Sequence, residues 1–381
     1  MKPRRFLLTC HDAGGTVPPM LAIAEVLVRS GHEVSFLSQP SVKRRAERAG
    51  CRFFAFSAIP DYARRELLEE QFALTVPVIT GTSVGDDVTA LARDRRADLI
   101  VVDANLGGGL AAAEALAQPS VVLLHSMYKT FVDTWFADLW PLLGSAINQT
   151  RHAYGLAAVD DWPAAFASHD RLFAVVPSVF DAAVADVPTA MRHFGFLGPR
   201  GGTIGVDAAG RFPPGDGPTV LVGLSTTYQA HEGLLQTIVD ALEGIAARAL
   251  VSTAGQVDIG SLRAPSNVAV VDFVPHVQVM TGTDVMVTHA GLGSVAAALS
   301  FGVPLVCTPI DRDQPLNAQR VADLGAGTTL ARSATAGDIR RALELVLSEA
   351  SYRHAAASLA KVSADEGGAA AAAAELEAIL D

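Results

Sequence analysis

The sequence predicts an α/β protein of two similar domains, each built on a parallel β-sheet. Three observations lead to this prediction. The chain has 381 residues, which is more than one average domain holds. Short apolar runs, often β-branched, alternate with helical stretches, as is typical of buried parallel strands and their crossover helices. Residues 198–218 are rich in Gly and Pro and lack apolar periodicity, so they indicate a linker between two halves.

The half before this linker consists of apolar runs that predict buried strands, with helices between them. A helix with proline in its first turn follows the first strand, and a basic helix with a solvated face follows the second. Residues 61–96 are also helical in pattern, and the helix is expected to break at Pro77 and at residues 81–83. The expected strands lie at residues 6–10, 32–37, 98–103 and 120–125, and the two helices at 18–27 and 42–50.

The half after the linker repeats this plan. A helix is expected over residues 232–247, and the alanine-rich tail after Ser351 is also expected to be helical. The expected strands lie at residues 219–223, 249–252, 268–273, 285–287 and 305–307.

The most informative stretch runs from residue 284 to residue 314, where a strand, a glycine turn, a helix and a second strand follow one another. Gly291 and Gly293 let the backbone approach a ligand closely, and the N–H groups that begin the next helix favour an anion. His289 ends the first strand. A phosphate site is therefore predicted, although a Gly-x-Gly turn alone is equally consistent with a tight connection that binds nothing.

The composition argues against nucleic-acid and membrane partners, because the net charge is -11 at pH 7. Cys10, Cys51 and Cys307 are widely separated and lie near apolar runs, which favours buried, reduced thiols over a disulfide framework or a metal site. The N-terminal apolar run is cut short at His11 and Asp12, so no signal peptide is evident and a cytoplasmic protein is expected.

Three motifs in a fixed order carry a resemblance to a known family. They are HAGLGS at 289–294, GVP at 302–304 and DQPLNAQRVADLGAG at 313–327. Together they resemble the donor site of the nucleotide-sugar glycosyltransferases of GT-B fold, the family that includes plant and antibiotic-producer enzymes, and the resemblance covers nearly the whole chain.

This resemblance implies two Rossmann-like βαβ domains that face a central cleft. Residues 1–198 would form an N-terminal acceptor-binding domain, 199–218 the linker and 219–365 a C-terminal domain for the nucleotide sugar. A helix at 366–381 would cross back to the N-terminal domain.

The resemblance also implies roles in binding the sugar donor. The glycine turn and a second loop would contact the diphosphate, an aromatic ring would stack on the base, and the Asp-Gln pair would hold sugar hydroxyls. The residues concerned are Ser225, Thr226, Phe273, His276, His289, Gly291, Gly293, Ser294, Asp313 and Gln314.

The general base departs from the family pattern. Related enzymes carry Gly-His-Val-x-Pro in the first loop, sometimes with Asp for His, but here Thr16 stands at that position. A neutral hydroxyl cannot accept a proton at a useful pKa. Asp12 in the same loop and Asp103, which matches the second member of the family's dyad, are the preferred substitutes. His11, His125 and the absence of any protein base remain alternatives, and each of these residues also has an ordinary structural explanation.

Aromatic residues gather between residues 128 and 166, although they make up only 6% of the chain. Core packing explains this concentration as well as an aromatic pocket does. The resemblance favours the pocket, because the matching region of related enzymes covers the acceptor cleft. The acceptor-binding residues would then be His125, Tyr128, Trp135 and Trp140.

The leading hypothesis is an inverting glycosyltransferase that moves a sugar to a natural-product acceptor. Ala297 replaces a Glu that binds ribose hydroxyls in many relatives, which suits a deoxyribose nucleotide such as dTDP. A nucleotide-sugar-binding auxiliary protein with little catalysis is the main alternative, and a sugar-nucleotide epimerase is a weaker one. No metal and no cofactor beyond the nucleotide sugar are expected. The sugar, the acceptor and the oligomeric state stay open, including a homodimer.

Overall fold

The protein is described by a computed structural model, which covers residues 2–13, 15–59, 68–130, 132, 136–181, 188–198, 211–225 and 229–381. These residues divide into two compact units. Unit 1 holds the described residues up to 198 together with 365–381, and unit 2 those from 211 to 364. Thr226, Trp135 and much of the expected linker lie outside the described residues.

Unit 1 is built on a seven-stranded parallel sheet whose strand order is β3-β2-β1-β4-β5-β6-β7. The central strands are short apolar runs, and β4 and β5 are buried along their whole length, as expected for strands covered on both faces. The strands are β1 (Arg5–Thr9), β2 (Glu33–Ser38), β3 (Arg52–Ala55), β4 (Leu99–Asp103), β5 (Ser120–Leu124), β6 (Arg171–Ala174) and β7 (Met191–His193).

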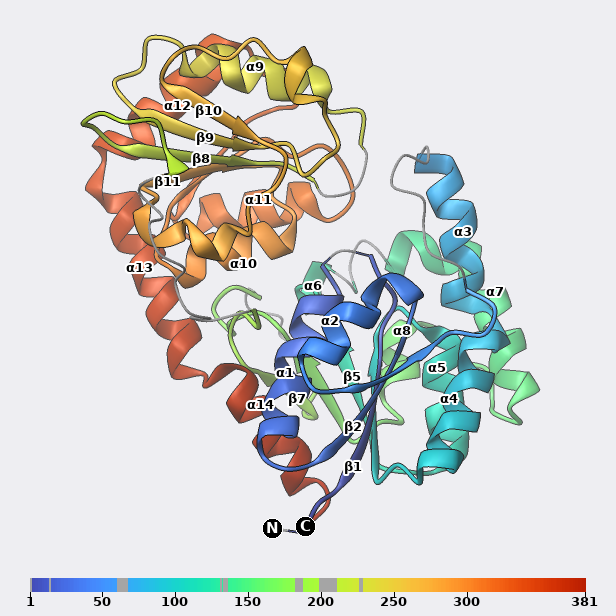
Figure 1. The fold of residues 1–381 in the computed structure, drawn as a ribbon. Helices are drawn as coiled ribbons and strands as arrows, with labels where there is room; N and C mark the ends of the chain where they lie inside the picture. Colours follow the sequence, from blue (N-terminus) through green and yellow to red (C-terminus); the bar gives the residue numbers. More distant parts are fainter. Residues whose placement is uncertain are drawn as a thin grey trace. The chain divides into compact units, whose positions relative to one another are not determined.

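Helices cover both faces of this sheet. Figure 1 shows α1 and α14 on one face and α4 and α5 on the other. The helices of unit 1 are α1 (Val17–Arg29), α2 (Lys43–Arg48), α3 (Leu68–Thr80), α4 (Thr82–Arg95), α5 (Gly107–Leu116), α6 (Tyr128–Thr130), α7 (Phe136–Ala153), α8 (Trp162–Phe166) and α14 (Gly368–Ala378), with a 3₁₀ turn η1 (Pro40–Val42).

Unit 2 repeats the architecture with a six-stranded parallel sheet of order β10-β9-β8-β11-β12-β13. Figure 1 shows α9 and α12 on one face and α10 and α11 on the other. The strands are β8 (Thr219–Gly223), β9 (Arg248–Ser252), β10 (Val268–Val271), β11 (Val285–Thr288), β12 (Leu305–Cys307) and β13 (Gly327–Thr329). The helices are α9 (Glu232–Leu242), α10 (Leu292–Ser300), α11 (Gln314–Asp323), α12 (Ala336–Ser348) and α13 (Ala350–Asp365), with 3₁₀ turns η4 (Ile259–Ser261), η5 (His276–Gln278) and η6 (Met280–Gly282). The predicted fold class, two parallel-sheet α/β domains, is confirmed.

The strand order reverses at one place in each sheet. In unit 1 the reversal lies between β1 and β4, and in unit 2 between β8 and β11. Connections on the two sides of such a point leave toward opposite faces, so a crevice opens at the carboxyl ends of the two strands. Residues that directly follow these four strands are therefore placed to form sites.

Two predicted helix boundaries are wrong. Pro77 does not break α3, which continues to Thr80. The last turn buries Val78 and Ile79 in the core of unit 1, and this burial opposes the cost of one missing backbone hydrogen bond. The helix expected over 232–247 ends at Leu242, because Gly244 adopts the left-handed conformation with φ of 75° and turns the chain.

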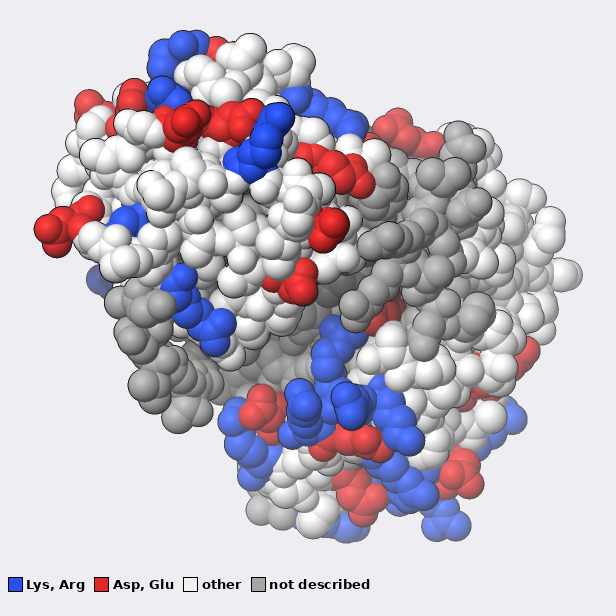
Figure 2. All heavy atoms as spheres, turned by 45° about the horizontal axis from the view of Figure 1, so that its top comes forward, with Lys and Arg blue, Asp and Glu red and all other residues white. Residues whose placement is uncertain are grey.

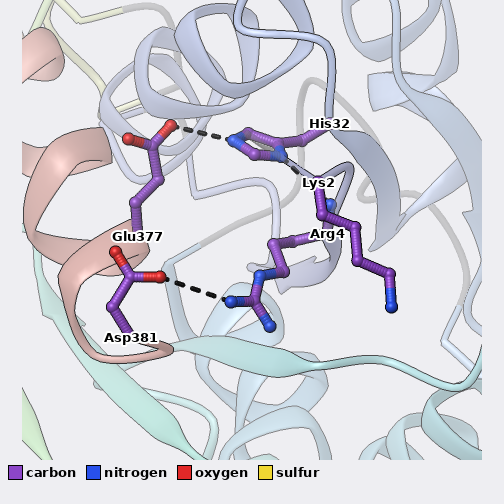
Figure 3. Close-up of a pocket in the computed structure, with 5 residues that line it drawn as sticks. All are labelled: Lys2, Arg4, His32, Glu377 and Asp381. Atoms are coloured by element: carbon purple, nitrogen blue, oxygen red, sulfur yellow. Dashed lines mark hydrogen bonds and ion pairs between the residues drawn. The ribbon is translucent and has the colours of Figure 1, made fainter.

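The C-terminal helix α14 packs against α1, and the two ends of the described chain lie side by side in Figure 1. Polar contacts fix this arrangement (Figure 3). The backbone N–H of Arg4 donates to His32 Nδ1 at 3.1 Å, so His32 Nε2 carries the hydrogen and donates to Glu377 Oε1 at 2.8 Å. Arg4 also pairs with Asp381 at 3.3 Å. The cavity that these residues line with Lys2 is about 70 Å³, too small for a nucleotide sugar.

Charged side chains of both signs are mixed over the face that Figure 2 shows, although Lys and Arg gather in the lower part of the view. Helix α2 exposes Lys43, Arg44 and Arg48. Acidic partners offset some of this charge, since Lys43 lies 3.9 Å from Glu47. This mixture agrees with the overall net charge of -11.

Replacing Glu377 with Ala is expected to lower the free energy of unfolding by about 1 to 3 kcal/mol, because the largely buried His32 loses its hydrogen-bond acceptor. Guanidinium unfolding of both proteins measures the difference. Glu344→Ala, at an exposed position of α12, is the control and should change stability by less than about 0.5 kcal/mol. Equal effects of the two substitutions would show that the His32 contact does not stabilise the fold.

Candidate functional site

His289 directly follows β11 at the strand-order reversal of unit 2, and the local backbone fixes its ring. Ala290 adopts a left-handed φ of 63°, and Gly291 then caps α10. A Cβ at Gly291 would lie 2.6 Å from His289 Nε2, so only glycine leaves space for the ring. Thr288 Oγ1 lies 3.4 Å from His289 Nδ1. These contacts place His289 Nε2 beside the start of α10.

The start of α10 is a suitable anion site. The first N–H groups of a helix have no intrahelical acceptor, and the helix dipole adds a partial positive charge there. Gly293 is exposed, and a Cβ added to it would meet nothing within 4 Å, so its backbone is open to a ligand. Ser294 is partly exposed in the same turn. The predicted residues of the glycine turn are thus brought together.

Three histidines and one arginine surround this turn. Burial, together with the proximity of His231, His276 and Arg312, lowers the pKa of His289 to about 3. Burial also lowers the pKa of His276 to about 4 and lowers that of His231. The histidines are therefore neutral at pH 7 and offer N–H groups, while Arg312 supplies a positive charge.

The ring of His276 is accommodated by a second glycine. A Cβ at Gly223 would lie 2.4 Å from His276 Nε2. Gly223 ends β8 and pairs in register with Thr288, the residue before His289. The ring of His276, which lies in η5, therefore reaches the same edge of the sheet as His289.

Gln314 is held inside the protein by hydrogen bonds. Its Oε1 accepts from the backbone N–H groups of Ile310 and Asp311 at 2.9 and 3.1 Å. Its Nε2 donates to Gln229 Oε1 at 3.0 Å, and Gln229 Nε2 in turn donates to Ser225 Oγ at 2.8 Å. The side chain predicted to hold sugar hydroxyls thus connects the loop after β12 to the loop after β8.

Asp313 is joined to the glycine turn through Asn317. The Nδ2 of Asn317 donates to Asp313 Oδ2 at 2.8 Å and to the carbonyl of Ala290 at 3.0 Å. Asn317 is fully buried, whereas Asp313 is partly exposed and accessible to a ligand. Phe273, the predicted stacking residue, is 62% exposed.

The strand-order reversal of unit 1 holds a second group of titratable side chains. Asp103 ends β4, is fully buried, and accepts from the backbone N–H of Asn105 at 2.9 Å. His125 Nδ1 lies 3.0 Å from Asp103 Oδ2, and His11 Nδ1 lies 4.0 Å from Oδ1. Burial alone would raise the pKa of Asp103, but the two histidines and the Asn105 N–H hold it below its usual value. Burial lowers the pKa of His11, so this ring is neutral.

The other two candidates for the base are engaged in the first loop. Asp12 Oδ2 accepts from Arg45 Nη2 at 2.7 Å and from Ser41 Oγ at 2.8 Å. The hydroxyl of Thr16 is buried and donates to the backbone carbonyl of His11. Asp12 thus joins the first loop to Ser41 and Arg45 and does not cap α1.

The aromatic residues of unit 1 pack mainly into its core. Tyr128 is 4% exposed and belongs to the core cluster, Trp162 is fully buried, and Trp140 packs edge-on against Trp162 at 5.8 Å between ring centroids. Phe166 also packs against Trp162, at 6.1 Å between ring centroids. For these residues the structure supports core packing over an aromatic pocket, because the rings are covered by neighbouring helices.

The sequence predictions missed seven residues of these sites, which are Ser41, Arg45, Asn105, Gln229, His231, Arg312 and Asn317. Asn317 and Gln229 connect the loops of unit 2, and Asn105 and Arg45 contact the titratable residues of unit 1. Only Asn317 had a usable signal, since it lies four positions after Asp313 on one face of a helix.

Among the residues that the structure describes, no group of three or more His, Cys, Asp or Glu side chains is arranged to hold a metal ion. No helix in the described part of the chain is long and apolar enough to span a membrane.

Buried neutral histidines should make stability depend on pH. Burial lowers the pKa of His289 to about 3 and that of His169 to about 4, whereas an unfolded histidine titrates near pH ~6.5. As the pH falls below the unfolded value, the unfolded chain binds protons first, so the free energy of unfolding falls by about 1.4 kcal/mol per histidine and pH unit.

Guanidinium unfolding at pH 7.5 and 5.0 tests this dependence. The His289→Asn variant should lose roughly 2 kcal/mol less than the wild type over this interval, because one such histidine has been removed. Identical losses in the two proteins would contradict a neutral, buried His289.

Comparisons with known proteins agree with the fold and with the motifs. Residues 236–379 match the family model of the erythromycin biosynthesis protein CIII-like C-terminal domain. The chain is similar to the 4'-demethylrebeccamycin synthase of Lentzea aerocolonigenes, with 28% identity covering 92% of this chain and 94% of the relative.

Two solved structures superpose over the full length. The glycotransferase of kitacinnamycin has a TM-score of 0.83 at 22% identity, covering 100% of this chain and 99% of that one. The glycosyltransferase VinC, solved in complex with dTDP, has a TM-score of 0.73 at 22% identity, covering 99% of each chain. The resemblance drawn from the three motifs is confirmed. Residues 236–379 thus match the C-terminal domain of an antibiotic-biosynthesis family, and the chain as a whole has the GT-B fold of the solved glycosyltransferases.

Proposed function

We propose that this protein is an inverting glycosyltransferase that moves a deoxysugar from a dTDP donor to a natural-product acceptor. The observation that carries the proposal is the placement of His289 Nε2 beside the open start of α10, with His231, His276 and Arg312 close enough to act on its charge. These groups are hydrogen-bond donors, and a diphosphate consists almost entirely of acceptors.

Stabilisation of the leaving diphosphate follows from the same groups. As the bond from the sugar to the diphosphate breaks, negative charge grows on the β-phosphate oxygens. Preorganised N–H groups and Arg312 stabilise that charge without reorganisation.

Because protein groups supply this stabilisation, we propose that transfer requires no metal ion. The turnover number measured in excess EDTA should therefore equal the turnover number measured without EDTA.

Two features support a thymidine nucleotide. Phe273 offers a 62% exposed ring on which a planar base can stack. Ala297, which lies in α10, offers no carboxylate for a ribose 2′-hydroxyl. The complex of the similar protein VinC with dTDP agrees with this choice.

The acceptor class rests on the relatives. The 4'-demethylrebeccamycin synthase and the demethyllactenocin mycarosyltransferase of Streptomyces fradiae carry natural products in their names. We therefore propose an aromatic or polyketide aglycone. Inversion follows if the acceptor attacks the anomeric carbon directly, opposite the departing diphosphate, in one displacement.

The sugar is proposed to contact Asp313. Its carboxylate is oriented by Asn317 and remains partly exposed, so it can accept from sugar hydroxyls. Gln314 is proposed to shape the same loop through its hydrogen bonds with Ile310, Asp311 and Gln229, beside its expected contact with the sugar.

Replacing His289 with Ala should weaken dTDP binding by about 1 to 3 kcal/mol, the worth of a hydrogen bond to a charged group. This corresponds to roughly 5- to 150-fold in Kd, measured by calorimetry. His354→Ala, on α13 at an exposed position, is the matched control and should bind normally. An unchanged affinity of the His289 variant would place the nucleotide elsewhere.

Asp313→Asn should reduce the turnover number far more than it reduces the affinity for free dTDP, because the carboxylate is assigned to the sugar. Steady-state kinetics with a dTDP-sugar, together with calorimetry, separate the two effects. Equal losses would assign Asp313 to the nucleotide or to folding.

Normal dTDP binding by the wild-type protein, with no sugar transfer to any acceptor in a producer extract, would instead support the non-catalytic auxiliary protein.

A further inference from the structure

Transfer to a hydroxyl requires a group that takes the hydroxyl proton, and the first loop does not offer one. Thr16 is a neutral hydroxyl that donates to a backbone carbonyl. The Asp12 carboxylate is bound by Arg45 and Ser41. The proton acceptor therefore has to come from another part of unit 1, and this inference rests on the proposed transfer activity.

The buried carboxylate of Asp103 determines the hydrogen position on His125. A carboxylate has only acceptor atoms when it is ionised, and the surrounding groups hold the pKa of Asp103 below its usual value. The ring nitrogen nearest to this carboxylate is His125 Nδ1, at 3.0 Å, and the negative charge favours a hydrogen on that nitrogen. In the neutral ring the other nitrogen, Nε2, then has the lone pair.

A second contact agrees with this assignment. The amide nitrogen of Asn105 lies 3.4 Å from His125 Nε2, and that nitrogen has only hydrogens to offer. The contact is long, and its direction agrees with a lone pair on Nε2. Asn105 also holds Asp103 through its backbone N–H, and thus orients both members of the pair.

Accessibility distinguishes the two histidines beside Asp103. The side chain of His125 is 15% exposed, whereas that of His11 is 2% exposed and that of Asp103 is fully buried. Only His125 can contact an acceptor. Strand register explains its position, because Asp103 pairs with Leu123 and His125 lies two residues further along, on the same face.

We propose that His125 Nε2 is the general base of the sugar transfer and that Asp103 is its positioning residue. The acceptor oxygen forms a bond to the anomeric carbon while the bond from that carbon to the diphosphate breaks. The diphosphate leaves with the bonding electron pair, and the acceptor proton moves to His125 Nε2. Asp103 stabilises the imidazolium that results, which later returns its proton to solvent.

Kinetics of matched variants test this proposal. His125→Gln and Asp103→Asn should each lower the turnover number by about 100- to 10,000-fold while leaving the Kd for dTDP within about twofold. The exposed His152→Gln serves as the control and should stay within about threefold of the wild type, and Asp12→Asn tests the competing carboxylate. A loss with Asp12→Asn but not with His125→Gln would overturn the assignment.

A change of acceptor separates base catalysis from a structural role. An acidic phenol such as 4-nitrophenol loses its proton with little help from a base. The factor by which His125→Gln lowers the turnover number should therefore be at least about tenfold smaller with this phenol than with an alkyl alcohol as acceptor. A merely misfolded or loosened variant would lose the same factor with both acceptors, and that result would also overturn the proposal.

NMR of ¹⁵N-histidine-labelled protein gives a readout that does not depend on transfer. The His125 ring should carry its hydrogen on Nδ1 in the wild type and lose this preference in Asp103→Asn. A wild-type protein that transfers no sugar would refute the proposed function, whereas a His125 ring protonated on Nε2 would refute the present inference by itself.

Discussion

The reversal of strand order in each parallel sheet is the constraint on which both candidate sites depend. All strands of a sheet run in one direction, so their carboxyl ends meet at one edge, and the reversal keeps the two central loops apart. His11 and Asp103 follow β1 and end β4, and Ser225 and His289 follow β8 and β11. Within each sheet, residues that are far apart in the chain thus reach the same edge, because all strands run in one direction.

Burial acts on the two sites in opposite ways. In unit 2 it lowers the pKa values of His289 and His276 to about 3 and about 4, so these rings stay neutral beside Arg312 and present N–H groups to an anion. In unit 1 burial opposes the ionisation of Asp103, but His125 and the neighbouring N–H outweigh it and keep a negative charge inside the protein. The site in unit 2 is therefore suited to bind an anion, and the site in unit 1 is suited to stabilise a positive charge that develops on a histidine ring.

Side-chain positions in unit 2 are fixed before any ligand arrives. The rings of His276 and His289 occupy the space that a Cβ would need at Gly223 and Gly291. Asn317 then fastens the glycine turn to the start of α11. Catalytic groups held in this manner need little reorganisation during reaction, which is the main source of electrostatic catalysis.

The sequence by itself determined the fold class, nine of the thirteen described strands and the glycine turn, because these depend on local patterns of apolar residues and glycines. The short strands β3, β6, β7 and β13 were not predicted. Tertiary structure decided which polar side chains meet. Gln314 bonds to Gln229, which is 85 residues away, and Asp12 bonds to Arg45, 33 residues away, so neither contact leaves a local pattern. Burial was also decided by tertiary structure. Tyr128 belongs to the core cluster of unit 1, and Pro77 stays within α3, where the neighbouring residues Val78 and Ile79 are buried in the same cluster. Pairing of Asp103 with His125 required the register of β4 against β5, which no single segment encodes.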